Sequence, residues 1–314
     1  MIPSGGVLVV ALSSAALMGL AIQRGATCMV AAVDEVLIHR RAHRAAALAE
    51  AAVWVGGLVS LAAAMGWLRM TPAVYPVTPA TVAGGTLLGF GAWVNRACVF
   101  GAVARIGSGE WAYLATPLGF FLGCLVPFSA PLPAAEPSEL GVGGGAVAIA
   151  ILFAMFASWR LVAAVRAPRL GQFLWHPHRA TLLIAVTFVI TLLSAGAWAY
   201  TDALAALARS RDSMLPLRLA MGAALLGGAV AGGAIAGKLR RECPEAAALL
   251  RCGAGGALMG MGAMLIPGSN DGLILLGLPA LLPHAWVAVA VMTLSIAAAI
   301  RLSAVTSAAR VANR

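Results

Sequence analysis

Charge is scarce in this sequence. Asp, Glu, Lys and Arg make up 10% of its 314 residues, whereas 61% of the residues are hydrophobic. A water-soluble domain carries about 25% charged residues, so this chain lacks the charge to cover a soluble surface. The composition excludes a soluble catalytic domain and predicts an integral membrane protein whose outer surface meets lipid.

Patterns of common catalytic and metal sites are also missing. The five cysteines have no zinc-like spacing, and their odd number implies no disulfide framework. His176 and His178 lie two apart in a short polar segment and form no metal set. The sequence contains no nucleotide-binding loop and no nucleophile–base triad. We therefore predict no metal site, no cofactor and no enzymatic activity.

Long apolar runs are abundant. A transmembrane helix needs about 20 apolar residues. A secretory signal peptide has basic residues before its apolar core, whereas the first basic residue here is Arg24, so we read the first apolar run as a retained span. The pattern predicts an all-α membrane protein with about nine transmembrane helices. Uninterrupted runs cover 46–68, 111–127, 140–160, 180–200, 216–236 and 284–300, and regions broken by Gly, Pro or polar residues cover 6–38, 81–107 and 252–278.

The distribution of basic residues predicts the orientation. If the chain crosses the membrane nine times, four basic residues fall on one side: Arg69, Arg209, Arg211 and Arg218. Since basic loops stay in the cytoplasm, we expect the bacterial inner membrane, a periplasmic N-terminus and a cytoplasmic C-terminus. The net charge of +10 then reflects topology and not nucleic-acid binding. The opposite side holds Arg40, Arg41, Arg44, Arg160, Arg166, Arg169, Arg179, Lys238, Arg240, Arg241, Arg251, Arg301, Arg310 and Arg314.

Two of the broken regions resemble each other. Residues 85–102 and 256–273 align without gaps at an offset of 171, and nine crossings would send them in opposite directions. We therefore predict one membrane domain, 1–314, built from two inverted half-repeats, 1–139 and 140–314. Inverted repeats with discontinuous helices are typical of small-solute transporters, although the same glycine spacing also packs helices. The predicted helix-break glycines are Gly25, Gly89, Gly91, Gly260, Gly262 and Gly268.

Polar residues interrupt the broken regions. An arginine inside the membrane costs about 2.5–3.5 kcal/mol on insertion scales, so it indicates function or a buried partner. Short helices that begin at such breaks expose N–H groups that attract an anion. We predict that these residues line a path for a small anion: Gln23, Arg24, Cys28, Asn95, Arg96, Cys98, Ser269 and Asn270.

One carboxylate and three further cysteines stand apart from this set. Asp271 would repel an anion unless it paired with Arg96 or Arg24, and we expect it to cap the following short helix. Cys124, Cys243 and Cys252 occur in ordinary sequence contexts. We interpret them as small apolar residues without a functional role.

The segments GLAIQRGATC and GFGAWVNRAC, with the second glycine-patterned copy, carry a resemblance. The chain resembles the YeeE/YedE family of sulfur-transport proteins. This resemblance implies an hourglass-shaped, nine-span protein in which cysteines at a central constriction pass thiosulfate by S–H hydrogen bonds. Two of the family's cysteine positions match Cys28 and Cys98, whereas the third falls at Ser269. Because serine replaces that thiol, sulfite, another sulfur oxyanion or a selenium analogue fits as well as thiosulfate.

The resemblance also implies a cytoplasmic sulfur-carrier partner of the TusA/TsuB type. Basic segments at 160–179 and 238–251 offer it a docking surface, or bind lipid headgroups. Our leading hypothesis is a permease or channel that moves a small sulfur-containing anion inward. The alternatives are a membrane scaffold that docks a sulfur carrier, and an intramembrane thiol enzyme that forms a persulfide on Cys28 or Cys98.

Overall fold

Helices form nearly all of the structure. The computed structural model describes residues 5–25, 28–68, 73–126, 136–137, 144–166, 177–209, 214–240, 242–266 and 268–312. The first half holds α1 (Gly5–Gly25), α2 (Met29–His39), α3 (His43–Ala64), β1 (Ala73–Val74), α4 (Pro79–Asn95), α5 (Val99–Gly107), η1 (Trp111–Leu114) and α6 (Ala115–Cys124). The rest holds β2 (Glu136–Pro137), α7 (Gly144–Val165), α9 (Pro177–Ala195), α10 (Tyr200–Arg209), α11 (Leu215–Ile235), α12 (Ala246–Leu265), α13 (Asn270–Gly272), η2 (Leu273–Gly277) and α14 (Pro283–Ala312).

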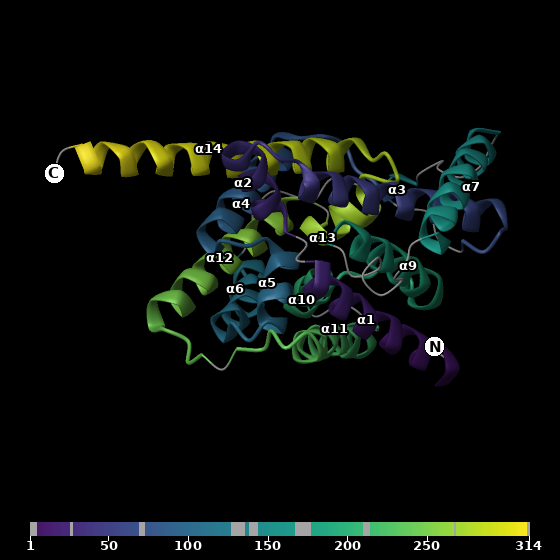
Figure 1. Ribbon diagram of the computed structural model, residues 1–314, viewed down its shortest axis with the longest axis horizontal. Coiled ribbons are helices and arrows are strands. Elements are labelled where there is room, and N and C mark those ends of the chain that lie inside the picture. The colour runs from purple at the N-terminus through teal and green to yellow at the C-terminus, as the bar shows by residue number, and fades with distance from the viewer. Residues whose placement is uncertain are drawn as a thin grey trace.

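The helices suit a membrane. Among the described residues, seven helical segments are long and apolar enough to cross a bilayer, and Trp111–Cys124 and Ile151–Val162 are shorter apolar helices. Helix α7 exposes Leu152, Met155 and Trp159, as expected of a surface that faces lipid. These features confirm the prediction of an all-α membrane protein. Helix α1 begins and α14 ends at opposite ends of the molecule (Figure 1).

Four of the apolar segments are broken, one more than the sequence predicts. Helix α1 gives way to α2, α4 to α5 and α12 to α13, as expected. The uninterrupted span predicted at 180–200 is wrong, because α9 ends at Ala195 and α10 begins at Tyr200. Gly196 adopts a φ of 86° and donates its N–H to the Leu192 carbonyl. A glycine in this left-handed conformation commonly ends a helix.

The internal repeat extends over most of the chain. When the bounds of the first-half helices are shifted by 171 residues, they fall on helices of the second half. Each half therefore has the same order of long and short helices, and α7 stands between the halves without a counterpart. The matching elements are α1 and α9, α2 and α10, α3 and α11, α4 and α12, α5 and α13 with η2, and α6 with the first turns of α14.

Four of the predicted helix-break glycines lie inside helices. Helix α4 runs through Gly89 and Gly91, and α12 runs through Gly260 and Gly262, so the prediction that they break helices is wrong. They occupy helix crossings instead: a Cβ on Gly91 would lie 2.8 Å from a backbone oxygen of α12. Backbones of crossing helices approach this closely only where the residues are small. Gly25 ends α1, and Gly268, with a φ of 126°, lies at the break before α13.

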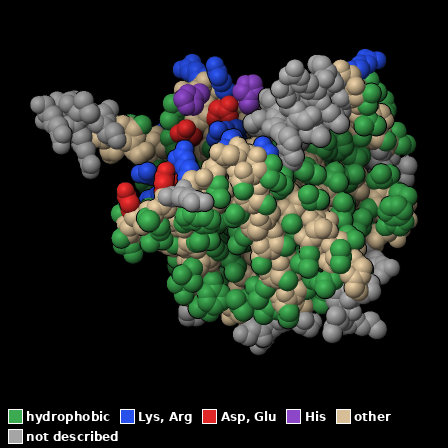
Figure 2. Space-filling view, turned by 60° about the horizontal axis from the view of Figure 1, so that its bottom comes forward, with side chains coloured by type: hydrophobic (Ala, Val, Ile, Leu, Met, Phe, Trp, Pro, Cys, Tyr) green, Lys and Arg blue, Asp and Glu red, His purple; other side chains and the backbone are tan. Residues whose placement is uncertain are grey.

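Many charged side chains gather in one region of the face shown in Figure 2. Figure 2 shows blue, red and purple side chains together at the upper left, above a surface that is mainly hydrophobic. His39 and His43 are the exposed histidines of the described residues, so the purple atoms mark the turn between α2 and α3. Arg40 and Arg41 are exposed in the same turn. An apolar belt capped by charge is the arrangement expected of a membrane protein.

Candidate functional site

Two buried thiols meet where α2 and α5 begin. Cys28 is the N-cap of α2 and Cys98 is the N-cap of α5; 8% of the first and 0% of the second residue is exposed. The backbone N–H of Met29, the residue after Cys28, donates to Cys98 Sγ at 3.2 Å, and Cys28 Sγ lies against Gly101 of the helix that Cys98 caps. The sequence predicts that both residues line one path, although they lie 70 positions apart. The structure brings them together at the starts of α2 and α5.

Gly101 makes room for this thiol pair. A Cβ at this position would lie 2.5 Å from Cys28 Sγ, which is closer than atoms of this kind approach. Gly101 lies one turn into α5, which starts at Val99 and carries Cys98 as its cap. Helix α5 therefore has no side chain where the Cys28 thiol lies, and the Cys98 thiol lies at its N-terminal end.

In the second half, a cluster of oxygen atoms surrounds Ser269. Ser269 is the N-cap of α13, and 1% of it is exposed. Its hydroxyl contacts the Thr201 hydroxyl and the carboxyls of Asp202 and Asp271. The distance to Asp202 Oδ1 is 3.0 Å. The Thr201 hydroxyl also donates to the Asp271 carboxylate. Ser269 has a single hydroxyl hydrogen to donate. The sequence predicts that this hydrogen binds the solute, whereas in the structure it is donated within the protein.

Asn270 has no such partners. It is the first residue of α13, 1% of it is exposed, and neither its amide nitrogen nor its amide oxygen has a hydrogen-bond partner among the described residues. A buried polar group without a partner costs about 1–3 kcal/mol. Helix α13 packs against α5, the helix that Cys98 caps. The unsatisfied amide of Asn270 is therefore the feature of this region that most directly calls for a ligand.

Helix α10 links the two halves of the site. The Tyr200 hydroxyl donates to the carbonyl of Val99, the residue after Cys98, over 3.2 Å. The next residue, Thr201, contacts Ser269. A cavity of 10 Å³ lies between the halves, lined by Met18, Phe100, Trp198, Tyr200 and Asp271 among others. It has room for about one water molecule, so a larger solute would need this cavity to widen.

Among the described residues, Asp271 pairs with no arginine, which the sequence leaves open as one alternative. Its described polar partners are the hydroxyls of Thr201 and Ser269. It lies in the first turn of α13, where a carboxylate interacts favourably with the positive end of a helix. Asp202 also contacts Ser269, so two acids share this side of the site.

Asn95 is held by the protein itself. Its amide donates to the Ala97 carbonyl over 2.8 Å, and its amide oxygen accepts from the Thr116 hydroxyl over 3.0 Å. Its backbone carbonyl accepts from Arg251, so the end of α4 is satisfied. These contacts give Asn95 a structural role at the break between α4 and α5. The structure does not bring it to the thiols as a free donor.

Replacing Thr116 with valine tests that role. The change removes the donor to Asn95 and leaves a buried amide oxygen unpaired, so we expect a loss of about 1–3 kcal/mol in stability. The measurement is the thermal midpoint of the purified protein in detergent. Thr86→Val is the matched control, because Thr86 is exposed and bonds only to the Val82 carbonyl of its own helix. Equal midpoints for both variants would contradict the structural role.

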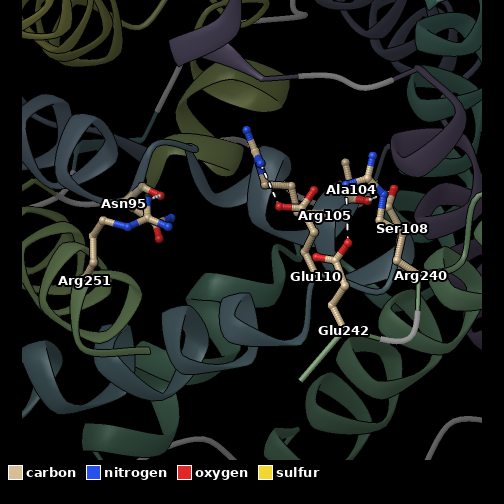
Figure 3. A network of polar contacts seen from close by, with 8 residues as sticks. All are labelled: Asn95, Ala104, Arg105, Ser108, Glu110, Arg240, Glu242 and Arg251. Atoms are coloured by element: carbon tan, nitrogen blue, oxygen red, sulfur yellow. Dashed lines mark hydrogen bonds and ion pairs between the residues drawn. The ribbon is translucent and has the colours of Figure 1, made fainter. Parts of the chain in front are cut away.

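Figure 3 shows two polar groups that hold the segments around α5. In one, Arg251 of α12 reaches the Asn95 carbonyl. In the other, Arg105 and Glu110 form an ion pair at 2.8 Å, and the Ser108 carbonyl accepts the backbone N–H of Arg240 over 2.9 Å. The loop after α11 is therefore fastened to the end of α5. Both helices that flank the Arg96 break are tied to the second half.

The described contacts do not join three other predicted path residues to the thiols. Gln23 donates to Ser108 over 3.4 Å, at the far end of α5 from Cys98. Arg24 is half-buried in the last turn of α1. Arg96 is exposed and ends α4 in the left-handed conformation, with a φ of 60°. The structure therefore brings Cys28 and Cys98 together, and Ser269 and Asn270 together, but does not gather all eight residues.

Sequence reasoning misses three residues of α10. Tyr200, Thr201 and Asp202 follow the unexpected break at Gly196, and each contacts the site. The repeat is the signal that would have found them, because Tyr200 lies 171 residues after Met29 and α10 matches α2. Among the described residues, no group of three or more His, Cys, Asp or Glu side chains is arranged to hold a metal ion.

Comparison with known proteins adds one match. A family model described as sulphur transport matches residues 24–298, a stretch that includes both thiols and the whole Ser269 cluster. No curated protein matches the chain. The match covers both halves of the repeat, from the end of α1 into α14.

Proposed function

Because the chain belongs to the sulphur transport family, we propose that it is a permease that carries thiosulfate or a related sulfur oxyanion into the cytoplasm. Family membership confirms the resemblance to YeeE/YedE proteins and establishes a membrane sulfur transporter in general terms. The solute, the direction and the cysteine mechanism form our proposal. The meeting of Cys28 and Cys98 at the starts of α2 and α5 is the observation that carries it.

The thiol pair suits a single, polarizable anion. A thiol is a weak and polarizable donor, so it contacts a sulfur atom without burying a fixed charge. Both sulfurs lie at helix N-termini, where the helix dipole favours negative charge. A sulfur oxyanion between the thiols would accept a hydrogen bond from each of them. Weak donors also release the solute readily, which a permease requires.

Asn270 supplies the donor of the second half in this proposal. The hydroxyl of Ser269 already contacts two carboxyls, whereas both amide atoms of Asn270 lack partners among the described residues. An anion that leaves the thiols would accept from the Asn270 amide. The acids Asp202 and Asp271 would keep the anion from settling deeper in the second half, because like charges repel.

Charge distribution supports the proposed orientation. The turn between α2 and α3 exposes Arg40 and Arg41, the first turn of α3 exposes Arg44, and the loop after α11 exposes Arg240. Basic loops mark the cytoplasmic side, so solute that enters at the other side would leave between these segments. We propose the bacterial inner membrane as the location. A cytoplasmic sulfur carrier of the TusA/TsuB type would dock on the same basic surface.

Uptake by proteoliposomes tests the proposal. We expect purified protein to take up radiolabelled thiosulfate without any partner protein. Cys28→Ala and Cys98→Ala should each reduce the rate about fivefold to tenfold, because one hydrogen bond contributes about 1 kcal/mol and 1.4 kcal/mol is a factor of ten. Competition with sulfite and selenite would then define the solute.

Cys243→Ser is the matched control, because Cys243 is exposed in the loop after α11 and distant in sequence from the thiol pair. It should transport at the normal rate. If both alanine variants transported thiosulfate as fast as this control, the cysteine mechanism would be wrong. Liposomes that took up no sulfur anion at all would instead favour a scaffold that docks a sulfur carrier.

A further inference from the structure

The two thiols of the path are close enough to react with each other. The N–H of Met29, next to Cys28, donates to Cys98 Sγ over 3.2 Å. Cys28 Sγ lies against Gly101, three residues after Cys98, so the two thiols lie side by side. A disulfide needs Cβ atoms within about 3.5–4.5 Å of each other, a distance that the backbone sets. The contact of Met29 with Cys98 Sγ shows that the starts of α2 and α5 lie side by side.

We propose that Cys28 and Cys98 form a redox-active dithiol that a small disulfide, such as oxidised glutathione, converts to an intramolecular disulfide when the path widens enough to admit it. The thiolate of one cysteine attacks the small disulfide and releases one small thiol. The thiolate of the other cysteine attacks the resulting mixed disulfide and releases the second small thiol. The protein loses two electrons and two protons, and the small disulfide gains them.

The surroundings of the pair support this chemistry. The attacking species in exchange is a thiolate, and the Met29 N–H supplies a hydrogen-bond donor directly to one of the sulfurs. The second thiol lies beside the first, so a mixed disulfide on either cysteine would be resolved within the protein. Among the described residues, the Cys124 thiol instead donates to the Gly260 carbonyl over 3.7 Å.

Oxidation would close the path. A disulfide carries no S–H group, so both donors of the first half would be lost together. It would also join the start of α2 covalently to the start of α5. A transporter of reduced sulfur would then stop when oxidised small thiols accumulate, and reduction would reopen it. This consequence for uptake rests on the proposed function, whereas formation of the disulfide does not.

Intact-mass measurement after alkylation tests the disulfide. The protein is Cys124→Ala, Cys243→Ser, Cys252→Ala, which leaves the pair alone. Before oxidation we expect two alkyl groups per chain. After treatment with oxidised glutathione we expect none and no glutathione adduct, and dithiothreitol should restore both. Adding Cys98→Ala is the control, since Cys28 would then keep glutathione as a mixed disulfide.

Each result decides one part of the proposal. Two alkylatable thiols after oxidation, or a stable glutathione adduct on the intact pair, would overturn the disulfide. A disulfide that leaves thiosulfate uptake by proteoliposomes unchanged would overturn the closing role. If the reduced protein moved no solute, the proposed function would fail while the masses still decided the chemistry. Should the triple variant fold poorly, peptide mapping of the unmodified protein gives the same answer.

Discussion

Replacing Asn270 with leucine is expected to stabilise the protein and to stop most of its transport. The asparagine side chain is buried, and neither amide atom has a partner among the described residues. Leucine has nearly the same shape and no polar atoms, so the variant should gain about 1–3 kcal/mol, the cost of an unsatisfied buried group. The readout of stability is the thermal midpoint in detergent.

The same change should reduce thiosulfate uptake by tenfold to about a hundredfold. A hydrogen bond to a charged group contributes about 1.5–3 kcal/mol, and each 1.4 kcal/mol is a factor of ten. Substitution of a solute-binding residue should change stability and uptake in opposite directions, because its polar atoms are unpaired until the solute binds. A residue with a structural role would lower both quantities together.

Asn95→Leu is the matched control for this experiment. Asn95 is equally buried, but its amide donates to Ala97 and accepts from Thr116. The same substitution should therefore destabilise the protein at position 95 and stabilise it at position 270. If Asn270→Leu lowered the thermal midpoint as Asn95→Leu does, Asn270 would have a protein partner and the path would not include it.

Much of the fold was predictable, because hydropathy sets where a chain can cross a membrane. The break between α9 and α10 was not. Gly196 ends α9 within an apolar stretch with a φ of 86°. The presence of a single glycine in the sequence does not show that it adopts this conformation. Glycines such as Gly260 behave in the opposite way: they stay helical and serve packing. One residue type therefore marks both breaks and close contacts, and only the structure separates them.

The site was predictable in part, and the reason lies in the repeat. Cys28 and Cys98 stand out because each follows an arginine in a similar context. Their counterparts at an offset of 171 are Ala199 and Ser269, so at these two positions the repeat keeps the helix bounds but not the residue types. The contact of Thr201 with Ser269 joins positions 68 residues apart. Such a contact leaves no mark in local sequence, which is why the sequence does not reveal the role of α10.

Replacing Gly260 with leucine is expected to disrupt the crossing of α6 and α12. A Cβ on Gly260 would overlap the backbone oxygen of Phe120, and a Cβ on Gly123 would overlap that of Ala257, so the two helices touch backbone to backbone. A backbone oxygen cannot rotate away as a side chain does. Overpacking a tight interior costs about 1–3 kcal/mol, and this overlap should reach the upper end of that range or exceed it.

Gly227→Leu provides the matched control for this prediction. Gly227 lies within α11, is exposed and has no neighbouring atom within 4 Å of the place a Cβ would take, so leucine there would meet lipid. It should leave the thermal midpoint and the yield of monodisperse protein in detergent unchanged, whereas Gly260→Leu should lower both. Equal behaviour of the two variants would mean that α6 and α12 do not touch. Because α12 leads directly into Ser269 and Asn270, the crossing also positions the second half of the path, and uptake should fall in parallel with stability.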